Sequence, residues 1–369
     1  QIDLFSNEPG APYNFFPYQG GFFESLKFFY NADCDHQLQS RNPKNDFSNQ
    51  TIEGPNNETI RCWNIGHATI LIQINNFFII TDPIFDSCAS PVPGFILRSV
   101  PAACSIDELP PIDFILLSHS HYDHMNKPSI QNILKKNPKC LILCPLLLGQ
   151  RFLSSWKVNS FIEFDWRQHL IFHKRNDQLI SISPEQYDKS EVNNCVEFIC
   201  LPARHGSART GFDADQVLWC SWLIKFNNKI SIYFPGDTAV GPHFADIYEI
   251  RNQKRPLDLF LCPIGPQEPW KMMRNVHLDG KEAKQMSKNI HANVVVPIHH
   301  GVFPLGFKPE KTDLQIAIEA WQDTEGEDPN NVNELIPWKI GGRVDWNHET
   351  QRFVVTDLDQ IFDTSQHYY

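Results

Sequence analysis

The stretch DFILLSHSHYDHMN, residues 113–126, decides the fold class of this chain. An apolar run leads directly into three histidines and one aspartate at the spacing H-x-H-x-D-H. His119 and His121 are two positions apart on an extended segment, so both side chains project from the same face. Asp123 and His124 follow where the chain turns toward a helix-like segment. Because imidazole and carboxylate ligands without thiolate suit zinc, iron or manganese, the stretch predicts a metal site at a strand end.

The same pattern, a ligand-type residue directly after a buried strand, recurs at three later positions. His205 follows VEFICLPAR, Asp237 follows ISIYFPG, and His299 and His300 follow the run that begins NVVVP. Ligands gather at the C-terminal ends of strands in α/β architectures. Each of these residues taken alone could be structural. Together with the first motif they predict one shared site.

Length and composition limit the classes of function. The chain has 369 residues, enough for one large core or two modest ones. The net charge of -11 argues against a nucleic-acid partner, whose phosphates need a basic face. It also argues against polybasic docking on anionic lipid, while insertion of apolar side chains stays open. No apolar run approaches the roughly 18 residues of a transmembrane helix.

The ten cysteines contain no C-x-x-C pair and no small-domain framework. Several lie inside strand-like apolar runs, where a free cysteine behaves as a small buried hydrophobe. We expect them to be mostly reduced, which leaves the compartment undecided. The sequence begins at Gln1 without a methionine, and we expect a processed or trimmed chain.

The order of the chain indicates an aromatic-rich strap over residues 1–59 and a single hydrolase domain over residues 60–369. The strap is expected to pack over the main domain; the alternative is an apolar lip that contacts lipid or a partner. From Ile60 onward, hairpin strands closed by Asn-Asn pairs are followed by a β-α-β rhythm, and this arrangement occurs twice. Residues 174–194 are polar and turn-rich, which predicts a surface insertion.

The motifs SHSHYDH, PARH, FPGDT and PIHHG resemble those of the metallo-β-lactamase superfamily. The flanking strings NIGHATILI, TDPIFDSCASPV, ELPPIDFILLSHSHYDH, VLWCSW, CPIGPQEP and IHHGVF are similar to N-acyl-phosphatidylethanolamine phospholipase D and its bacterial relatives. The resemblance covers about residues 60–322. It implies a four-layered αβ/βα sandwich, in which two mixed sheets face each other, helices lie outside and metals bind at one rim.

This resemblance also implies a binuclear zinc site, for which iron or manganese would suit the same ligands. The implied ligands are His119, His121 and His205 on one ion, Asp123, His124 and His299 on the other, and Asp237 bridging both. Two such cations supply hydroxide near neutral pH and clamp a phosphodiester. Asp123 is placed to orient the attacking water as well as to bind metal. The implied reaction releases phosphatidic acid and an N-acylethanolamine from N-acyl-phosphatidylethanolamine.

Three other histidines receive different interpretations. His277 matches a histidine that the phospholipase branch keeps near the scissile phosphate, where it would stabilise charge or protonate the leaving oxygen. The alternative is a solvent-facing histidine at a helix start. This chain has Val276 before His277, where the branch can carry a glutamine. His67, in GHAT, is expected beneath the site rather than on a metal, and His300 is less suited to bind metal than His299.

The ligand set leaves the substrate open, because the same metal pair can attack phosphorus or carbonyl carbon. The first hypothesis is the lipid phosphodiesterase; the alternative is a soluble lactonase or another small-molecule phosphodiesterase or esterase. A complete ligand set argues against a non-catalytic binding protein. Phe95, Ile96 and Leu97, in the loop PVPGFILRSV, favour a phospholipid substrate and peripheral membrane contact, unless the loop folds onto the core. A homodimer stays open.

Overall fold

The computed structural model describes residues 59–176, 178–183, 194–210, 212–227, 229–250, 255–307, 310–325 and 333–355. The predicted N-terminal strap therefore lies almost wholly outside the described residues. The domain boundary at residue 60 stays a prediction.

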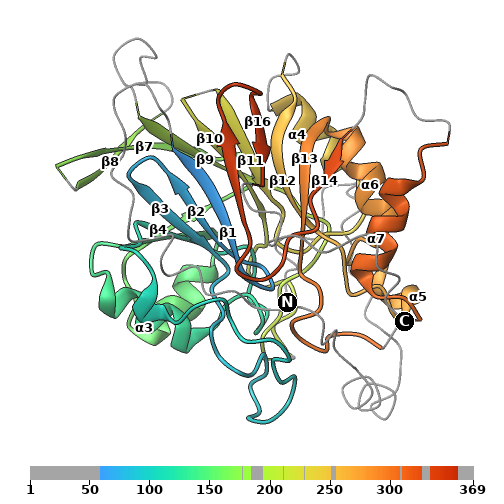
Figure 1. Cartoon of the computed structure of the whole chain (residues 1–369). Coiled ribbons are helices and arrows are strands. Elements are labelled where there is room, and N and C mark those ends of the chain that lie inside the picture. Colours follow the sequence, from blue (N-terminus) through green and yellow to red (C-terminus); the bar gives the residue numbers. More distant parts are fainter. Residues whose placement is uncertain are drawn as a thin grey trace.

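Two eight-stranded mixed sheets form the centre of the structure (Figure 1). The first has the order β16-β15-β1-β2-β3-β4-β5-β6, with the bounds β1 Ile60–Gly66, β2 Thr69–Ile74, β3 Phe77–Thr81, β4 Phe114–Leu116, β5 Leu141–Pro145, β6 Phe161–Phe164, β15 Arg343–Asn347 and β16 Arg352–Val354. The second has the order β14-β13-β12-β11-β10-β9-β7-β8, with the bounds β7 His169–Arg175, β8 Gln178–Ile182, β9 Cys195–Leu201, β10 Ser221–Phe226, β11 Ile230–Phe234, β12 Leu257–Pro263, β13 Ala292–Ile298 and β14 Glu334–Leu335.

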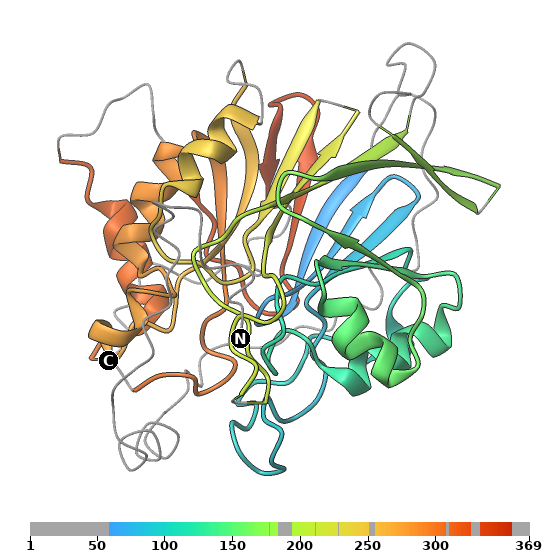
Figure 2. The ribbon, with the colours of Figure 1, turned by 180° about the vertical axis from the view of Figure 1, so that it is seen from behind.

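Helices cover the outer face of each sheet. Beside the first sheet lie α3 (Lys127–Lys136) and the short turns η1 (Ile106–Glu108), η2 (Gly149–Leu153) and η3 (Ser154–Trp156). Beside the second lie α4 (His243–Ile250), α5 (Trp270–Met273), α6 (Gly280–Asn289) and α7 (Asp313–Gln322) (Figures 1 and 2). The predicted αβ/βα sandwich is confirmed.

The central strands are buried on both faces, which explains their nearly continuous apolar sequence. In β4, Phe114 and Leu116 pack between the sheets, while Ile115 joins the outer core with helix residues such as Ile130. Both faces of the strand must therefore be apolar, since successive side chains alternate between them. Hydrophobic burial on both faces fixes the strand directions that the site depends on.

Each sheet combines antiparallel hairpins with parallel strands, as the repeated rhythm in the sequence predicts. In the first sheet β1, β2 and β3 are antiparallel neighbours, and β3 through β6 are parallel. In the second sheet β9, β10 and β11 are antiparallel neighbours, and β11 through β13 are parallel. Strands β1, β3 and β4 thus point in one direction within the first sheet, as β9, β11 and β13 do within the second.

The structure bears on three other sequence predictions: the surface insertion, the state of the cysteines and the absence of a transmembrane helix. Residues 174–176 and 178–182 form the end of the β7–β8 hairpin, and residues 184–193 lie outside the described residues, so a surface insertion there stays a prediction. All nine cysteines of the described segments are free thiols, and eight are buried. Within the residues described, no helix has the length and apolar character needed to cross a membrane.

Candidate metal centre

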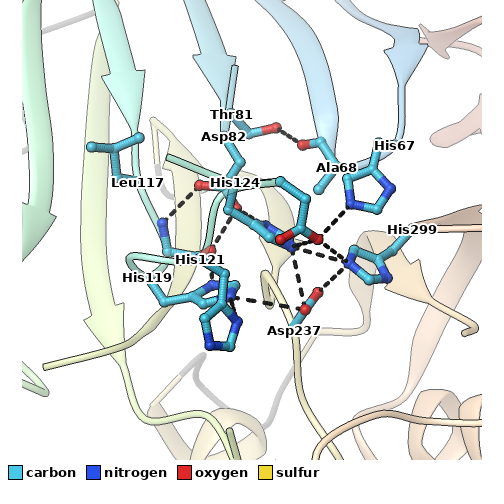
Figure 3. Close-up of polar contacts among 12 residues, drawn as sticks. His67, Ala68, Thr81, Asp82, Leu117, His119, His121, His124, Asp237 and His299 are labelled. Atoms are coloured by element: carbon cyan, nitrogen blue, oxygen red, sulfur yellow. Dashed lines mark hydrogen bonds and ion pairs between the residues drawn. The ribbon is translucent and has the colours of Figure 1, made fainter. Parts of the chain in front are cut away.

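The candidate site lies at one rim of the sandwich, where parallel strands of both sheets end. Each of six strands is followed by a residue or motif of the site: His67 after β1, Asp82 after β3, residues 119–124 after β4, His205 after β9, Asp237 after β11, and His299 after β13. Figure 3 shows the side chains of His67, Asp82, His119, His121, His124, Asp237 and His299 gathered at this rim. The candidate ligands were predicted as polar residues that directly follow buried strands, and the structure places such residues together at this rim.

A first group of potential ligands joins three histidines to one carboxylate. His119 Nε2 lies 2.8 Å from His121 Nδ1, and His121 Nδ1 lies 3.2 Å from His205 Nε2. Asp237 Oδ2 lies 3.9 Å from His119 Nε2 and 3.6 Å from His205 Nε2. The ligand atoms of all four lie within 4.8 Å of one another.

A second group lies beside the first and is formed by Asp123, His124 and His299. Asp123 Oδ2 lies 3.2 Å from His124 Nε2 and 3.3 Å from His299 Nε2. The two imidazole nitrogens are 3.0 Å apart. The structure therefore brings together the three residues that the resemblance assigns to a second ion.

Asp237 contacts both groups with its two carboxylate oxygens. Oδ2 faces the first group and also lies 3.2 Å from His124 Nε2, while Oδ1 lies 3.1 Å from His299 Nε2. Gly236 allows this approach: its φ is +61°, and an added Cβ would overlap with the side chain of Ser118. The glycine in FPGD therefore lets the end of β11 pack against the loop that carries the H-x-H-x-D-H motif.

The hydrogen bonds of His205 and His299 show which ring nitrogen faces the site, and therefore whether the site suits a cation. His205 Nδ1 donates to the Val276 carbonyl and His299 Nδ1 donates to the Gly265 carbonyl, each at 2.9 Å. A carbonyl oxygen only accepts, so Nδ1 keeps its proton, and the neutral form of each ring directs the Nε2 lone pair into the site. Such lone pairs facing carboxylates and other nitrogens repel unless a cation lies between them. A divalent metal fits this donor set.

The spacing of the nitrogens agrees with this conclusion. Two nitrogens bound to one tetrahedral zinc at about 2.0–2.1 Å lie about 3.4 Å apart. The spacings within the first group, 2.8 and 3.2 Å, are slightly shorter than this. The chain therefore has a metal-binding His/Asp cluster.

The pKa values divide the candidate ligands into two sets: those of His121 and His205 are lowered by burial, while those of His124 and His299, against the effect of burial, are raised by the carboxylates of Asp237 and Asp123. Burial lowers the pKa of His205 to about 3 and that of His121 to about 4, so both rings are neutral at pH 7. Burial opposes the charge on Asp237, but His124 and His299 hold the pKa of Asp237 well below its usual range. Burial also opposes the charge on His299, but Asp237 and Asp123 raise its pKa to about 9. A metal ion would displace that proton.

Asp82 supports the site, a role that the sequence reasoning missed. Its Oδ2 accepts a 2.6 Å hydrogen bond from His124 Nδ1, and its Oδ1 accepts one of 2.8 Å from the Ser118 backbone N–H. It thereby fixes the orientation of His124 and the start of the metal-binding loop. The signal was present, because Asp82 directly follows the apolar strand FFIIT. A lone aspartate before a proline is also an ordinary turn signal, so the sequence did not distinguish a supporting role for Asp82 from a simple turn.

His67 lies against the second group, and its ligand atom is within 4.8 Å of those of Asp123, His124 and His299, so its expected position off the metal stays a prediction. Its Nε2 contacts Asp123 Oδ2 at 2.9 Å, and its ring centroid lies 4.1 Å from that of His299. Its backbone carbonyl accepts from the His299 N–H at 3.1 Å. Both histidines have a left-handed φ, 61° for His67 and 59° for His299, which is uncommon outside glycine. This pair of turns joins the two sheets under the site.

A cavity of about 400 Å³ opens beside the first group. Its walls are three histidines, part of the loop after β9, and residues of α5 and the turn that follows: His121, His205, His277, Gly206, Ser207, Ala208, Ala214, Asp215, Lys271, Met272, Met273, Asn275 and Val276. His277 Nδ1 is buried, has no hydrogen-bond partner and lies 3.8 Å from Asp237 Oδ2. His277 therefore faces the site rather than solvent, while His300 joins none of the ligand groups in the described residues.

The predicted substrate-contact loop has a different position. Phe95 is 47% exposed and Leu97 is 51% exposed, so these side chains do not fold onto the core. Ile96 is half-buried and packs against the core. None of the three lines the cavity. Their role in binding substrate stays a prediction.

Comparison with known proteins gives both sequence and structural relatives. A family model described as a beta-lactamase superfamily domain matches residues 78–300. An N-acyl-phosphatidylethanolamine-hydrolyzing phospholipase D of Caenorhabditis elegans is 30% identical over 255 residues, which are 66% of this chain and 64% of that protein. An uncharacterized protein of Mycobacterium tuberculosis is 29% identical over 288 residues, 76% of this chain and 67% of that protein.

A solved structure with a similar fold is a metallo hydrolase from the archaeon Ignicoccus hospitalis. Its TM-score is 0.53 at 16% sequence identity, and the match covers 78% of this chain and 99% of that one. This likeness concerns the fold alone. The match to the nematode phospholipase, in turn, spans slightly less than two thirds of that protein's length.

Asp82→Asn is expected to weaken metal binding by about 10–100-fold, because the amide cannot accept all the hydrogen bonds that the carboxylate accepts from His124 and Ser118. Competition with a chelator measures the affinity. Asp113→Asn is the matched control, since Asp113 accepts from the Phe78 N–H and from Lys174 at the opposite end of β4. Equal losses in both variants, or unchanged affinity in Asp82→Asn, would remove Asp82 from its supporting role.

Proposed function

Since the chain belongs to the beta-lactamase superfamily and is a metal-dependent hydrolase of that fold, we propose that it is a zinc-dependent phosphodiesterase of the phospholipase D type. Its proposed substrate is N-acyl-phosphatidylethanolamine or a related phospholipid, and the proposed products are phosphatidic acid and an N-acylethanolamine. The observation that carries the proposal is the pair of ligand groups that share Asp237 beside an open cavity. Similarity to the nematode phospholipase D supports the choice of substrate.

Two cations held by these groups would lower the pKa of a water molecule and neutralise charge on a phosphodiester. Asp237 would hold their spacing, because its two oxygens face different groups. Asp123 would orient the attacking water in addition to binding metal. Its Oδ2 is fixed by His67, so its direction is set before substrate arrives.

His277 is proposed to contact the reacting phosphate. Burial lowers its pKa to about 3, so the ring is neutral at pH 7 and carries one N–H. A neutral ring is a hydrogen-bond donor rather than a ready source of a proton. Stabilisation of charge on a phosphate or leaving oxygen therefore fits His277 better than acid catalysis does.

Phe95, Ile96 and Leu97 are proposed to contact the lipid substrate from the exposed loop that they occupy. Peripheral contact with a membrane follows from this proposal, since a phospholipid has to leave a bilayer to reach the metals. A homodimer stays a prediction.

Metal-replete protein is expected to hold close to two ions per chain, because seven ligands exceed what one ion binds. Elemental analysis gives both the number and the metal. Iron or manganese in place of zinc would leave the geometry intact and correct the metal. A limit of one ion per chain would contradict the binuclear site.

The substrate is tested by offering metal-loaded protein three compounds side by side. N-acyl-phosphatidylethanolamine in mixed micelles is expected to be hydrolysed with the highest kcat/KM, a short-chain phosphodiester more slowly, and a lactone slowest. Mass spectrometry identifies phosphatidic acid and N-acylethanolamine as products. Turnover of the lactone alone would replace the phospholipase proposal with the lactonase.

His277→Ala is expected to keep its metal and to lose turnover by about 10²–10³-fold, the usual effect of removing one donor to a developing charge. His277→Gln restores an N–H donor and is expected to recover part of the rate. Simultaneous loss of metal and activity in the alanine variant would instead make His277 a ligand. Unchanged turnover would show that its N–H does not meet the substrate.

A further inference from the structure

Exposed large apolar side chains gather at the metal end of the molecule. The described residues expose seven of them, and six belong to loops or to α5 at this end: Val92, Phe95, Leu97, Phe212, Trp270 and Phe307. We call these six the apolar collar. The seventh, Ile180, lies in β8. Single apolar residues on a surface are ordinary, but a set confined to one face marks an interaction surface.

Hydrogen bonds join collar segments to one another and to the chain after β13. The Ser99 N–H donates to the Val302 carbonyl at 2.9 Å, which joins the loop of Val92, Phe95 and Leu97 to the chain after β13. The Phe307 N–H donates to the Glu268 carbonyl at 3.0 Å, just before Trp270. In Figures 1 and 2 the four collar segments lie at the lower end, while the β7–β8 hairpin projects from the upper part.

Phe212 and Trp270 stand next to residues that line the cavity. Phe212 is 91% exposed and belongs to the loop of which Ala208 and Ala214 are cavity walls. Trp270 is 45% exposed and directly precedes Lys271, also a cavity wall. The two aromatic side chains thus come from the two segments that enclose the cavity.

The loop that carries Phe212 is fixed by hydrogen bonds. Asp213 Oδ1 accepts from the backbone N–H groups of Arg209 and Thr210, at 2.9 and 2.7 Å. The Arg209 guanidinium donates to the carbonyls of Ser120 and Met125, at 2.8 and 2.9 Å. These bonds anchor the loop to the metal-binding segment, so the side chain of Phe212 is held in water by the surrounding structure.

Cations accompany the aromatic residues on this face. The Arg274 guanidinium lies 4.2 Å from the centroid of the Trp270 ring, and Lys271 is exposed beside it. Within the described residues, no carboxylate forms an ion pair with Lys271. Tryptophan with adjacent lysine and arginine suits the head-group layer of a membrane, which combines apolar depth with phosphate charge.

We propose that the apolar collar inserts into the surface of a lipid bilayer and sets the cavity mouth against the membrane. This inference rests on the proposed function, because a phospholipid substrate brings long acyl chains. A cavity of about 400 Å³ is at the small end of pockets for drug-sized ligands, so it holds a head group while the chains stay outside. Phe212 and Trp270 stand beside the cavity walls, where those chains would emerge.

The experiment compares full-length, metal-loaded wild-type protein with Phe212→Ser/Trp270→Ser and with Ile180→Ser, the matched control on the β7–β8 hairpin. Vesicles of phosphatidylcholine, and of phosphatidylcholine and phosphatidylglycerol in equal parts, contain no N-acylated lipid, so binding is read without hydrolysis. Sedimentation is expected to show binding of the wild type that persists at high salt, since apolar burial is not screened. The double variant is expected to bind at least about tenfold more weakly, and Ile180→Ser as well as the wild type.

Several outcomes would overturn the proposal: wild type left in solution with both vesicles, release at high salt, or equal binding of the double variant. A dimer that the double variant breaks, with unchanged vesicle binding, would assign the collar to a second copy of the chain. Melting temperature and metal content confirm that the variants are folded. Vesicle binding without hydrolysis of N-acyl-phosphatidylethanolamine would reject the proposed function alone, and hydrolysis of a soluble diester without vesicle binding would reject the collar alone.

Discussion

Where the two sheets meet, imidazole nitrogens with bare lone pairs and two carboxylates face one another in a space largely closed to water. Burying such groups without a compensating charge is costly. The first sheet supplies the four residues of the H-x-H-x-D-H motif, and the second supplies His205, Asp237 and His299. A cation held by these residues would therefore join the sheets as well as serve chemistry, and metal binding would contribute to the free energy of folding.

The supports of the ligands belong to the same segments that form the cavity. Val276 orients His205 through its backbone carbonyl and also lines the cavity beside His277. The resemblance to the phospholipase branch raised the question of what this valine changes, since a glutamine can occupy that position. Because the hydrogen bond to His205 uses the backbone, the side chain of Val276 affects the cavity wall and leaves the orientation of His205 intact.

The sequence predicted which histidines and aspartates cluster because their signal is local: an apolar run, long enough to cross the core, ends in a histidine or aspartate. It also predicted the hairpins and the β-α-β rhythm from which both sheets are built. It could not place the cavity, whose walls come from segments about 60 residues apart in the chain. The exposure of Phe212, in a loop, and of Trp270, at the start of α5, was missed for a related reason: large aromatic side chains are usually buried, and only the packing of their neighbours shows that these two are exposed.

The topology explains why chemistry and surface contact occupy the same end. Parallel strands deliver all their C-terminal loops to one rim, so the loops that carry ligands and those that carry the apolar collar are neighbours. Arg209 provides a direct link, because it ties the loop of Phe212 to the carbonyls of Ser120, inside the H-x-H-x-D-H motif, and Met125, directly after it. A surface docked through Phe212 is therefore connected by direct hydrogen bonds to the segment that holds the metal. The opposite end of the sandwich, built from hairpins, has no such connection, and there the described part of the chain exposes a single large apolar side chain, Ile180.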